Sequence, residues 1–163
     1  MTDHAEPIPP SNVPSIVHRL NPFVARMLRV GVPMGPNVLI TIRGRNTGEP
    51  RTFPVAILHA DGRRFLFSPF GEVQWVKNLR ASGEAAIGRG RNPERVTAHE
   101  LDVESAARTL EAGLRPVLRV PVMGPMIAGW YGITRDSTPA DYLAAAGRHP
   151  AFELRPPEDA RQG

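Results

Sequence analysis

The middle of the chain, from residue 38 to residue 101, consists of short strand-like runs separated by tight turns. Alternation of apolar and polar residues predicts strands at Val38–Gly44, Thr52–Ala60, Arg64–Ser68, Glu84–Arg89, Arg95–Leu101 and Ala151–Leu154. Ala60-Asp61-Gly62 is typical of a tight hairpin turn. Short strands joined in this way favour a small barrel or antiparallel sheet over a βαβ repeat. We therefore expect an α+β fold with helices at the margins of the strands.

Helices are predicted on both sides of this strand-rich region and once within it. Apolar residues at spacings of three and four predict a helix over Ser15–Val30, with Pro22 as a break or a first-turn residue. Three shorter helices are predicted at Gln74–Ala81, Val103–Leu114 and Pro139–Gly147. Asp102 is the expected N-cap of the helix that follows it.

The 163 residues suffice for one domain with a real core and are too few for two. Residues 1–12 are acidic and rich in proline, and residues 156–163 are polar, so both segments are expected to be disordered tails around a single domain at 13–155. The N-terminal segment lacks the basic and apolar regions of a signal peptide. The apolar stretch Val120–Thr134 is too short to span a bilayer.

The absence of cysteine excludes disulfides, thiolate nucleophiles and cysteine-based metal sites. It also fits a reducing compartment, so we expect a cytoplasmic protein. The histidines show no metal-binding spacing, so no metal site is expected. Neither a G-x-S-x-G elbow nor a P-loop is present.

The net charge is +4, and Lys77 is the only lysine among the 20 basic residues. Arginine favours phosphate and carboxylate partners, because its planar guanidinium can bind them through two parallel hydrogen bonds. Such a charge is compatible with nucleic acid, an anionic membrane surface or an anionic small molecule. Nucleic acid is the least favoured of these, because the arginines are dispersed and aromatic residues make up only 6% of the chain.

Two glycine-containing turns combine positive charge, hydroxyl groups and exposed backbone amides. The first is Gly44–Arg51, between two predicted strands, and the second is Ser68–Gly71, which leads into the predicted helix at Gln74–Ala81. Backbone amides in turns and at helix starts bind anions, and arginine adds charge. The pair of turns therefore indicates a site for an anionic ligand that carries a ring.

These segments resemble the deazaflavin-dependent nitroreductase family, a split β-barrel group related to FMN-binding, pyridoxamine-phosphate-oxidase-like proteins. The resemblance is carried by Ile42–Pro54, Ser68–Gly71 and Trp75–Ala81. It implies a split β-barrel with an N-terminal helix, coenzyme F420 as cofactor, and hydride transfer to a quinone, enone or nitro acceptor. Such chemistry needs no protein nucleophile, because the cofactor carries the reactive bond.

The resemblance also implies roles for individual residues. The first turn and the strand after it would hold the phosphate and the flank of the ring through Arg45, Asn46, Thr47, Arg51 and Pro54. The second turn would lie against the ring through Ser68, Pro69, Phe70 and Gly71, and the next helix would add Trp75, Asn78, Leu79 and Arg80. Tyr142 takes the place of a tyrosine near the acceptor, so Tyr142 and Ser68 are the catalytic candidates.

Two positions depart from the family pattern. Asn46 stands where characterised relatives have lysine, and Ser68–Gly71 reads Ser-Pro-Phe-Gly where some have Ser-Lys-Gly-Gly. Both changes remove positive charge, and Pro69 has no N–H to donate. The compensating cations would be Arg43, Arg45, Arg51 and Arg80. FMN in the same fold and a non-catalytic F420-binding or carrier protein are therefore the alternatives.

The basic, amphipathic segment Ser15–Val30 has three interpretations: a helix packed on the barrel, a lid over the substrate, or a helix in contact with a membrane surface. The last would give peripheral membrane association. Split barrels of this kind often pair, so a homodimer is a further expectation.

Overall fold

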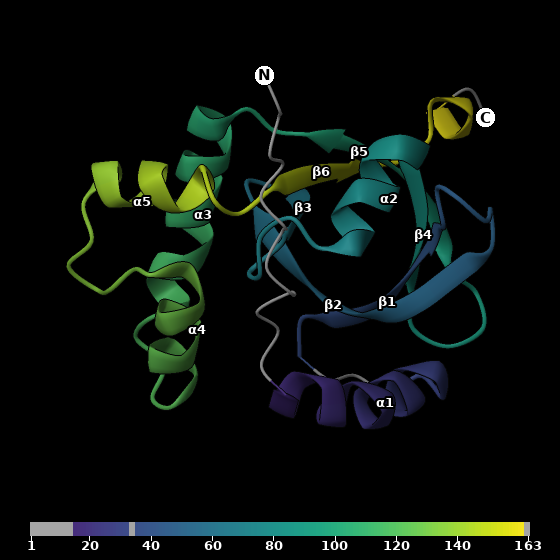
Figure 1. The fold of residues 1–163 in the computed structure, drawn as a ribbon, viewed down its shortest axis with the longest axis horizontal. Helices are drawn as coiled ribbons and strands as arrows, with labels where there is room; N and C mark the ends of the chain where they lie inside the picture. Colours follow the sequence, from purple (N-terminus) through teal and green to yellow (C-terminus); the bar gives the residue numbers. More distant parts are fainter. Residues whose placement is uncertain (1–14, 33–34, 162–163) are drawn as a thin grey trace, which may run out of the picture.

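The computed structural model describes residues 15–32 and 35–161; the predicted tail of residues 1–12 and the last two residues lie outside the described part. A β-barrel lies beside a lobe of helices, and α1 runs along the lower edge in Figure 1. The strands are β1 (Asn37–Arg43), β2 (Pro50–Ala60), β3 (Arg63–Phe67), β4 (Glu84–Gly88), β5 (Glu94–Glu100) and β6 (Ala151–Arg155). The helices are α1 (Ser15–Arg29), α2 (Gln74–Ser82), α3 (Val103–Val117), α4 (Met123–Tyr131) and α5 (Pro139–Ala146). The predicted α+β class is confirmed.

The strands close into a barrel in the order β1-β2-β3-β6-β5-β4, and every neighbouring pair is antiparallel. β2 is longer than its neighbours. It pairs with β1 over Pro50–Ala56 and with β3 only over Ile57–Ala60. Within the described residues, therefore, no strand pairs with the other edge of β2 over Pro50–Ala56. We call this stretch the open edge of β2; it is where the barrel is split.

The hairpin between β2 and β3 forms as its sequence predicts. Asp61 and Gly62 have φ angles of 51° and 71°. A two-residue hairpin loop needs positive φ at both residues, because only then does its twist match that of the two strands.

The barrel interior is apolar, and α2 contributes to it. Inward-facing residues of the strands, among them Ile40, Ile42 and Phe152, form one cluster with Val76 and Leu79 of α2. The strands supply them at every second position, as the period of a strand requires. α2 is thereby held against the barrel next to the first turn, and Gly83 ends it in the left-handed conformation at φ +69°.

A second core joins β3 to the helical lobe. Phe65 and Phe67 face Leu110 and Leu114 of α3, together with buried residues of α5. α4 is absent from the predicted elements, because two glycines and a proline interrupt the helical pattern of Met123–Tyr131. Its burial against this second core stabilises a helix that local propensity disfavours.

The predicted helix start at Asp102 is confirmed, since Asp102 Oδ1 accepts a hydrogen bond from the N–H of Ser105 at 2.8 Å. α3 continues past its predicted end at Leu114 to Val117, with Pro116 inside its last turn. The packing of Leu114 and Leu118 in the lobe core outweighs the hydrogen bond that a proline removes.

α1 covers the outer face of β1, where Ala25 and Leu28 bury Leu39. It continues through Pro22 rather than breaking there. At the other end of the chain, Glu158–Arg161 forms a short 3-10 helix, η1, inside the segment for which disorder is expected.

Candidate active site

The first turn joins β1 to β2 and is shorter than predicted: it spans residues 44–49, because Pro50 and Arg51 already belong to β2. The N–H of Gly44 donates to the carbonyl of Glu49 at 2.8 Å and closes the loop. A Cβ added to Gly44 would stand 2.9 Å from Thr47 Oγ1 and 3.5 Å from Arg51 Nε. The lack of a side chain at Gly44 thus lets the Thr47 hydroxyl approach the backbone closely, with Arg51 Nε nearby at ordinary contact distance.

Backbone donors are available on this turn. The N–H groups of Asn46 and Thr47 donate to no acceptor within the described part of the chain. Both residues are exposed. Unpaired turn amides next to a guanidinium are a common way to bind phosphate oxygens.

Asn78 of α2 fixes the turn to the barrel. Its side-chain Oδ1 accepts two hydrogen bonds from Arg45, one from the guanidinium Nη1 at 2.8 Å and one from the backbone N–H at 3.3 Å. Asn78 is buried, so a side chain unable to accept would leave polar groups without partners. Two residues predicted to bind cofactor are therefore in direct contact, and Asn78 acts on the position of Arg45.

Arg51 is a cation that lacks a partner among the described residues. It lies opposite Ile42 in the register of β1 and β2, hence on the inner face of the sheet, toward α2. It is exposed, and no residue in the described part of the chain pairs with it. Elsewhere arginines commonly meet carboxylates: Arg64 with Glu94, Arg80 with Glu72 and Glu100, Arg115 with Glu111, and Arg155 with Glu153.

The second turn, Ser68–Gly71, follows β3 and faces the open edge of β2, because β3 ends beside the residue where that edge begins. Ser68 is fully buried, and its hydroxyl donates to the carbonyl of Gly71 at 2.5 Å. The N–H of Gly71 donates back to the carbonyl of Ser68 at 3.3 Å. Both donors that the resemblance assigns to the ring are thus used inside the turn; the N–H of Phe70 has no acceptor among the described residues.

His149 holds this turn from the far end of the chain, and the sequence analysis missed it. Its Nδ1 lies 3.0 Å from the carbonyl oxygen of Ser68, so Nδ1 carries the proton and donates. Its ring packs edge-on against Tyr131 at 4.8 Å between centroids. Burial lowers the pKa of His149, which favours the neutral ring. No sequence spacing could indicate this pair, because 81 residues separate its members.

Two groups of aromatic rings lie near the open edge, one at Phe53 of β2 and one at the second turn. Trp75, at the start of α2, lies 6.4 Å from Phe53 of β2 and 6.2 Å from Phe152 of β6 between ring centroids. Phe70 of the second turn meets Trp130 of α4 edge-on at 5.4 Å. Phe53 and Trp130 are further residues that the sequence analysis did not assign to the site. The open edge therefore has charge at the first turn and aromatic surface near the second.

Three other predicted residues lie apart from this arrangement, and Tyr142, described below, is a fourth. Leu79 is fully buried in the barrel core. Pro54 pairs with Leu39 in the register and so lies on the outer face of β2, the face that α1 covers. Arg80 donates to Glu100 and also pairs with Glu72, contacts that raise its pKa and neutralise its charge.

Tyr142 is buried within the helical lobe, 1% exposed, between α3 and α5. Its hydroxyl has no hydrogen-bond partner in the described part of the chain, and the guanidinium of Arg115 lies 5.6 Å from its ring centroid. Burial raises the pKa of the phenol, with Arg115 acting in the opposite direction.

Tyr142→Phe is expected to leave turnover with any of the acceptors that the resemblance implies within about twofold, because a buried hydroxyl cannot reach an acceptor. The same change should leave the free energy of unfolding unchanged or raise it by up to about 1 kcal/mol, since it removes a polar group that lacks a partner. Steady-state kinetics and urea denaturation measure the two effects. A loss of turnover of about 100-fold or more would show that Tyr142 acts in catalysis.

Two shallow hollows in the described surface lie elsewhere. One, of about 360 Å³, is lined by residues near Arg64 and Arg155, and the other, of about 430 Å³, lies between Arg95 and η1. Neither includes a residue of the two turns. Their walls carry opposed charges rather than a cluster of unpaired donors, so the open edge is the stronger candidate site.

Comparison with known proteins agrees with this geometry. A family model described as "F420H(2)-dependent quinone reductase" matches residues 16–118. A solved structure titled "Structure of F420-H2 Dependent Reductase (FDR-A)" aligns with 74% of this chain and 94% of its own, at a TM-score of 0.50 and 19% identity. Another, titled "domain-swapped dimer", aligns with 88% of this chain and 100% of its own, at a TM-score of 0.52 and 19% identity.

A putative 5-nitroimidazole antibiotic resistance protein from Bacteroides thetaiotaomicron has a TM-score of 0.50, 10% identity, and coverage of 81% of this chain and 77% of its own. At these identities the structures show a common fold, the split β-barrel expected from the resemblance. Comparison with curated proteins gave no match. Because the family model covers more than half of the 163 residues, the chain belongs to the F420H(2)-dependent quinone reductase family and is an enzyme whose cofactor is F420.

Proposed function

We propose that this enzyme reduces quinones and that F420 lies along the open edge of β2, between the first and the second turn. The observation that carries the proposal is Arg51, an exposed guanidinium beside Gly44 that has no partner among the described residues. An unpaired charge at a fixed position contributes little to stability, so a role in ligand binding explains it better.

The residues of the first turn fit the anionic part of F420, which carries a phosphodiester and a γ-linked glutamate tail. Arg51 and Arg45 would hold these groups, with the N–H groups of Asn46 and Thr47 as further donors. Arg43 pairs with Pro50 in the register, so it starts from the outer face of the sheet; its guanidinium donates to the carbonyl of Gly48 at 3.2 Å and would add charge at the turn without contacting the ligand. These arginines compensate for the lysine that Asn46 replaces. Arg80 is left out of the proposal, because two carboxylates already neutralise it.

The residues near the second turn fit the ring. Reduced F420 supplies the hydride when it is bound. Trp75 and Phe53 offer apolar surface that would orient a flat ring and exclude water from the transfer. The N–H of Phe70 is the donor that the turn leaves unpaired, next to the Phe70–Trp130 contact. Pro69 therefore provides no backbone N–H, but the turn keeps the N–H of Phe70 as a donor.

A quinone fits the aromatic surface beside this turn better than a charged acceptor would, because Phe70 and Trp130 present ring faces and edges. Enones and nitro compounds share the flat shape and are the competing acceptors. We also propose that the enzyme is a homodimer, because one of the matched structures is titled "domain-swapped dimer".

The decisive experiment titrates purified protein with F420 and follows its fluorescence, then measures oxidation of reduced F420 with menadione, cyclohexenone and a nitroimidazole. We expect saturable binding and the highest kcat/KM with the quinone. A Kd above about 100 μM would overturn the proposal. Tight binding with no turnover on any acceptor would instead indicate a carrier protein, and a yellow protein that retains FMN on purification would indicate the flavin alternative.

A further inference from the structure

The second turn is held by three consecutive residues that lie between α5 and β6. The N–H of Ser68 donates to the carbonyl of Pro150 at 2.9 Å, and Nδ1 of His149 donates to the carbonyl of Ser68 at 3.0 Å. A Cβ added to Gly71 would lie 3.4 Å from the carbonyl oxygen of Arg148, so the last residue of the turn also touches this connection. Both ends of the second turn are therefore supported by a segment distant from it in the chain.

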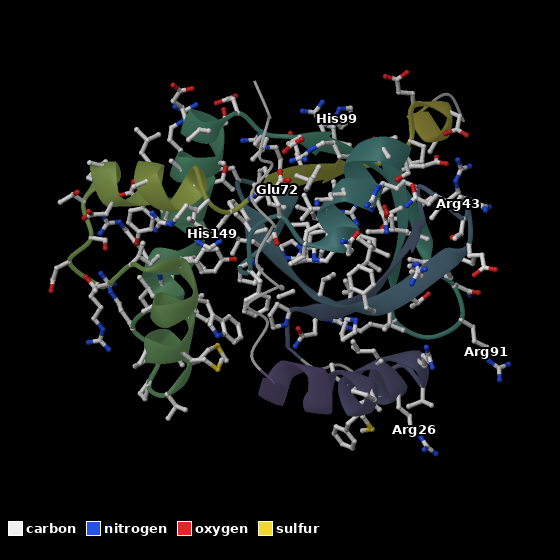
Figure 2. The ribbon with its side chains drawn as sticks, in the orientation of Figure 1. Arg26, Arg43, Glu72, Arg91, His99 and His149 are labelled. Atoms are coloured by element: carbon white, nitrogen blue, oxygen red, sulfur yellow. The ribbon has the colours of Figure 1, made fainter. Side chains whose placement is uncertain are left out.

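The same connection packs on α4. This helix is the most apolar of the α-helices, and neither it nor any other helix in the described part of the chain is long and apolar enough to cross a membrane. The ring of Tyr131 meets His149 edge-on at 4.8 Å, and the preceding residue, Trp130, meets Phe70 edge-on at 5.4 Å. His149 lies between the helical lobe and the barrel in Figure 2. The contacts thus form a closed circuit that begins at Ser68, passes through His149 and α4, and returns to Phe70.

Phe70 is the residue whose position this circuit determines. Its ring is half-buried against Trp130 on the side of the turn that faces the open edge of β2. Gly71, which follows it, has φ +76°, a conformation that glycine adopts without strain but from which an isolated turn readily departs. A turn that ends in such a glycine needs contacts from outside to keep the preceding ring in one place, and His149 provides two of them.

We propose that His149 is a positioning residue for the reaction: its Nδ1–H fixes the carbonyl of Ser68 and thereby holds the ring of Phe70 beside the acceptor. The inference rests on the proposed function, in which Phe70 forms part of the acceptor side. His149 acts through the turn and does not need to touch the acceptor or the cofactor. Only a donor at the position of Nδ1 is required, so a side-chain amide can take its place.

Two substitutions separate the donor from the ring. His149→Phe keeps an aromatic ring against Tyr131 and removes the hydrogen bond to Ser68. His149→Asn loses the ring and keeps an N–H, because the amide nitrogen of asparagine stands at the same distance from the backbone as Nδ1 of histidine. His59→Phe, at an exposed histidine of β2, is the control for the change of residue type.

The first measurement is amide hydrogen exchange of the full chain without F420, read by mass spectrometry in the peptide that contains Ser68 and Gly71, whose N–H groups are both hydrogen-bonded. Exchange in this peptide should be at least about tenfold faster in His149→Phe than in the wild type, because the turn opens more often. His149→Asn should stay within about threefold of the wild type, and His59→Phe should not differ from it. Urea denaturation verifies that each variant folds; should His149→Phe not fold, His149→Ala takes its place in the comparison with His149→Asn.

The second measurement is steady-state kinetics with reduced F420 and the acceptor that the wild type reduces best. His149→Phe should lower kcat/KM for the acceptor at least about tenfold, and His149→Asn should recover it to within about threefold. The Kd for F420 should change less than about threefold in both, because the charged first turn is proposed to dominate it. In a double-mutant cycle, Phe70→Ala/His149→Phe should be no more than about twofold slower than Phe70→Ala alone, since His149 acts through Phe70.

Equal exchange in the wild type and His149→Phe would overturn the proposal. So would a His149→Asn variant as impaired as His149→Phe, because the ring and not the donor would then be decisive. Losses that multiply in the double variant would show that His149 supports the fold without acting through Phe70. If the wild type reduces no acceptor, the proposed function fails, whereas the exchange measurement, made without F420, still decides whether His149 orders the turn.

Discussion

Arg51→Ala is expected to weaken F420 binding by about 1.5–3 kcal/mol, the typical contribution of a hydrogen bond to a charged group. This corresponds to a rise in Kd of roughly 10- to 150-fold. The loss should be large because Arg51 is fixed on a strand beside Gly44 and needs no rearrangement of an existing ion pair to bind phosphate. Fluorescence titration of F420 measures the effect directly.

Two further variants make this result specific. Arg91→Ala removes another exposed arginine, from the β4–β5 turn, which lies away from α2 in Figure 2, and should leave the Kd unchanged. Arg51→Lys should recover part of the affinity, because it keeps the charge but not the planar fork. An unchanged Kd in Arg51→Ala would remove Arg51 from the site, whereas equal losses in Arg51→Ala and Arg91→Ala would reveal only a general effect of net charge.

Phe152→Ala is expected to lower the free energy of unfolding by about 3–5 kcal/mol, since it leaves a cavity at the centre of the barrel. For a chain of this size the melting temperature should fall by roughly 6–20 °C. Phe152 is fully buried and also touches Trp75, so the loss of its ring removes support from one wall of the site. Thermal denaturation and F420 titration of the same sample measure both consequences.

Phe23→Ala provides the control for this result, because Phe23 is a phenylalanine exposed on α1. Its replacement should change the free energy of unfolding by no more than about 0.5 kcal/mol. Should Phe152→Ala cost as little as Phe23→Ala, Phe152 would not belong to a packed barrel core.

The proposed site differs from the predicted one chiefly in the residues that hold it together. The sequence places Asn78 and Arg45 on separate elements with the same role, whereas the structure makes Asn78 the acceptor that fixes Arg45. The hydroxyl of Ser68 donates to the carbonyl of Gly71, and Nδ1 of His149 donates to the carbonyl of Ser68. Residues that were expected to touch the ligand thus include some that position other residues.

Local patterns in the sequence determined most of the elements of this protein. Alternation predicts the six strands, spacings of three and four predict α1, and Asp61-Gly62 predicts the hairpin turn. Helix-like runs also predict α2, α3 and α5. These features follow from backbone geometry within a few residues, so a single segment contains all the information. The amino-acid sequence of the first turn, on which the resemblance to the family depends, is likewise contained in a single segment.

Only the tertiary structure decided which of the charged and polar groups remain available. Arg51 and Arg80 look alike in sequence, yet Arg80 meets Glu72 and Glu100 while Arg51 meets no described residue. Tyr142 is placed near the acceptor by resemblance and is buried by the packing of α3 on α5. The open edge of β2 exists because its two neighbours end at different points along it. Each of these outcomes depends on partners far apart in the chain, and a local period carries no information about them.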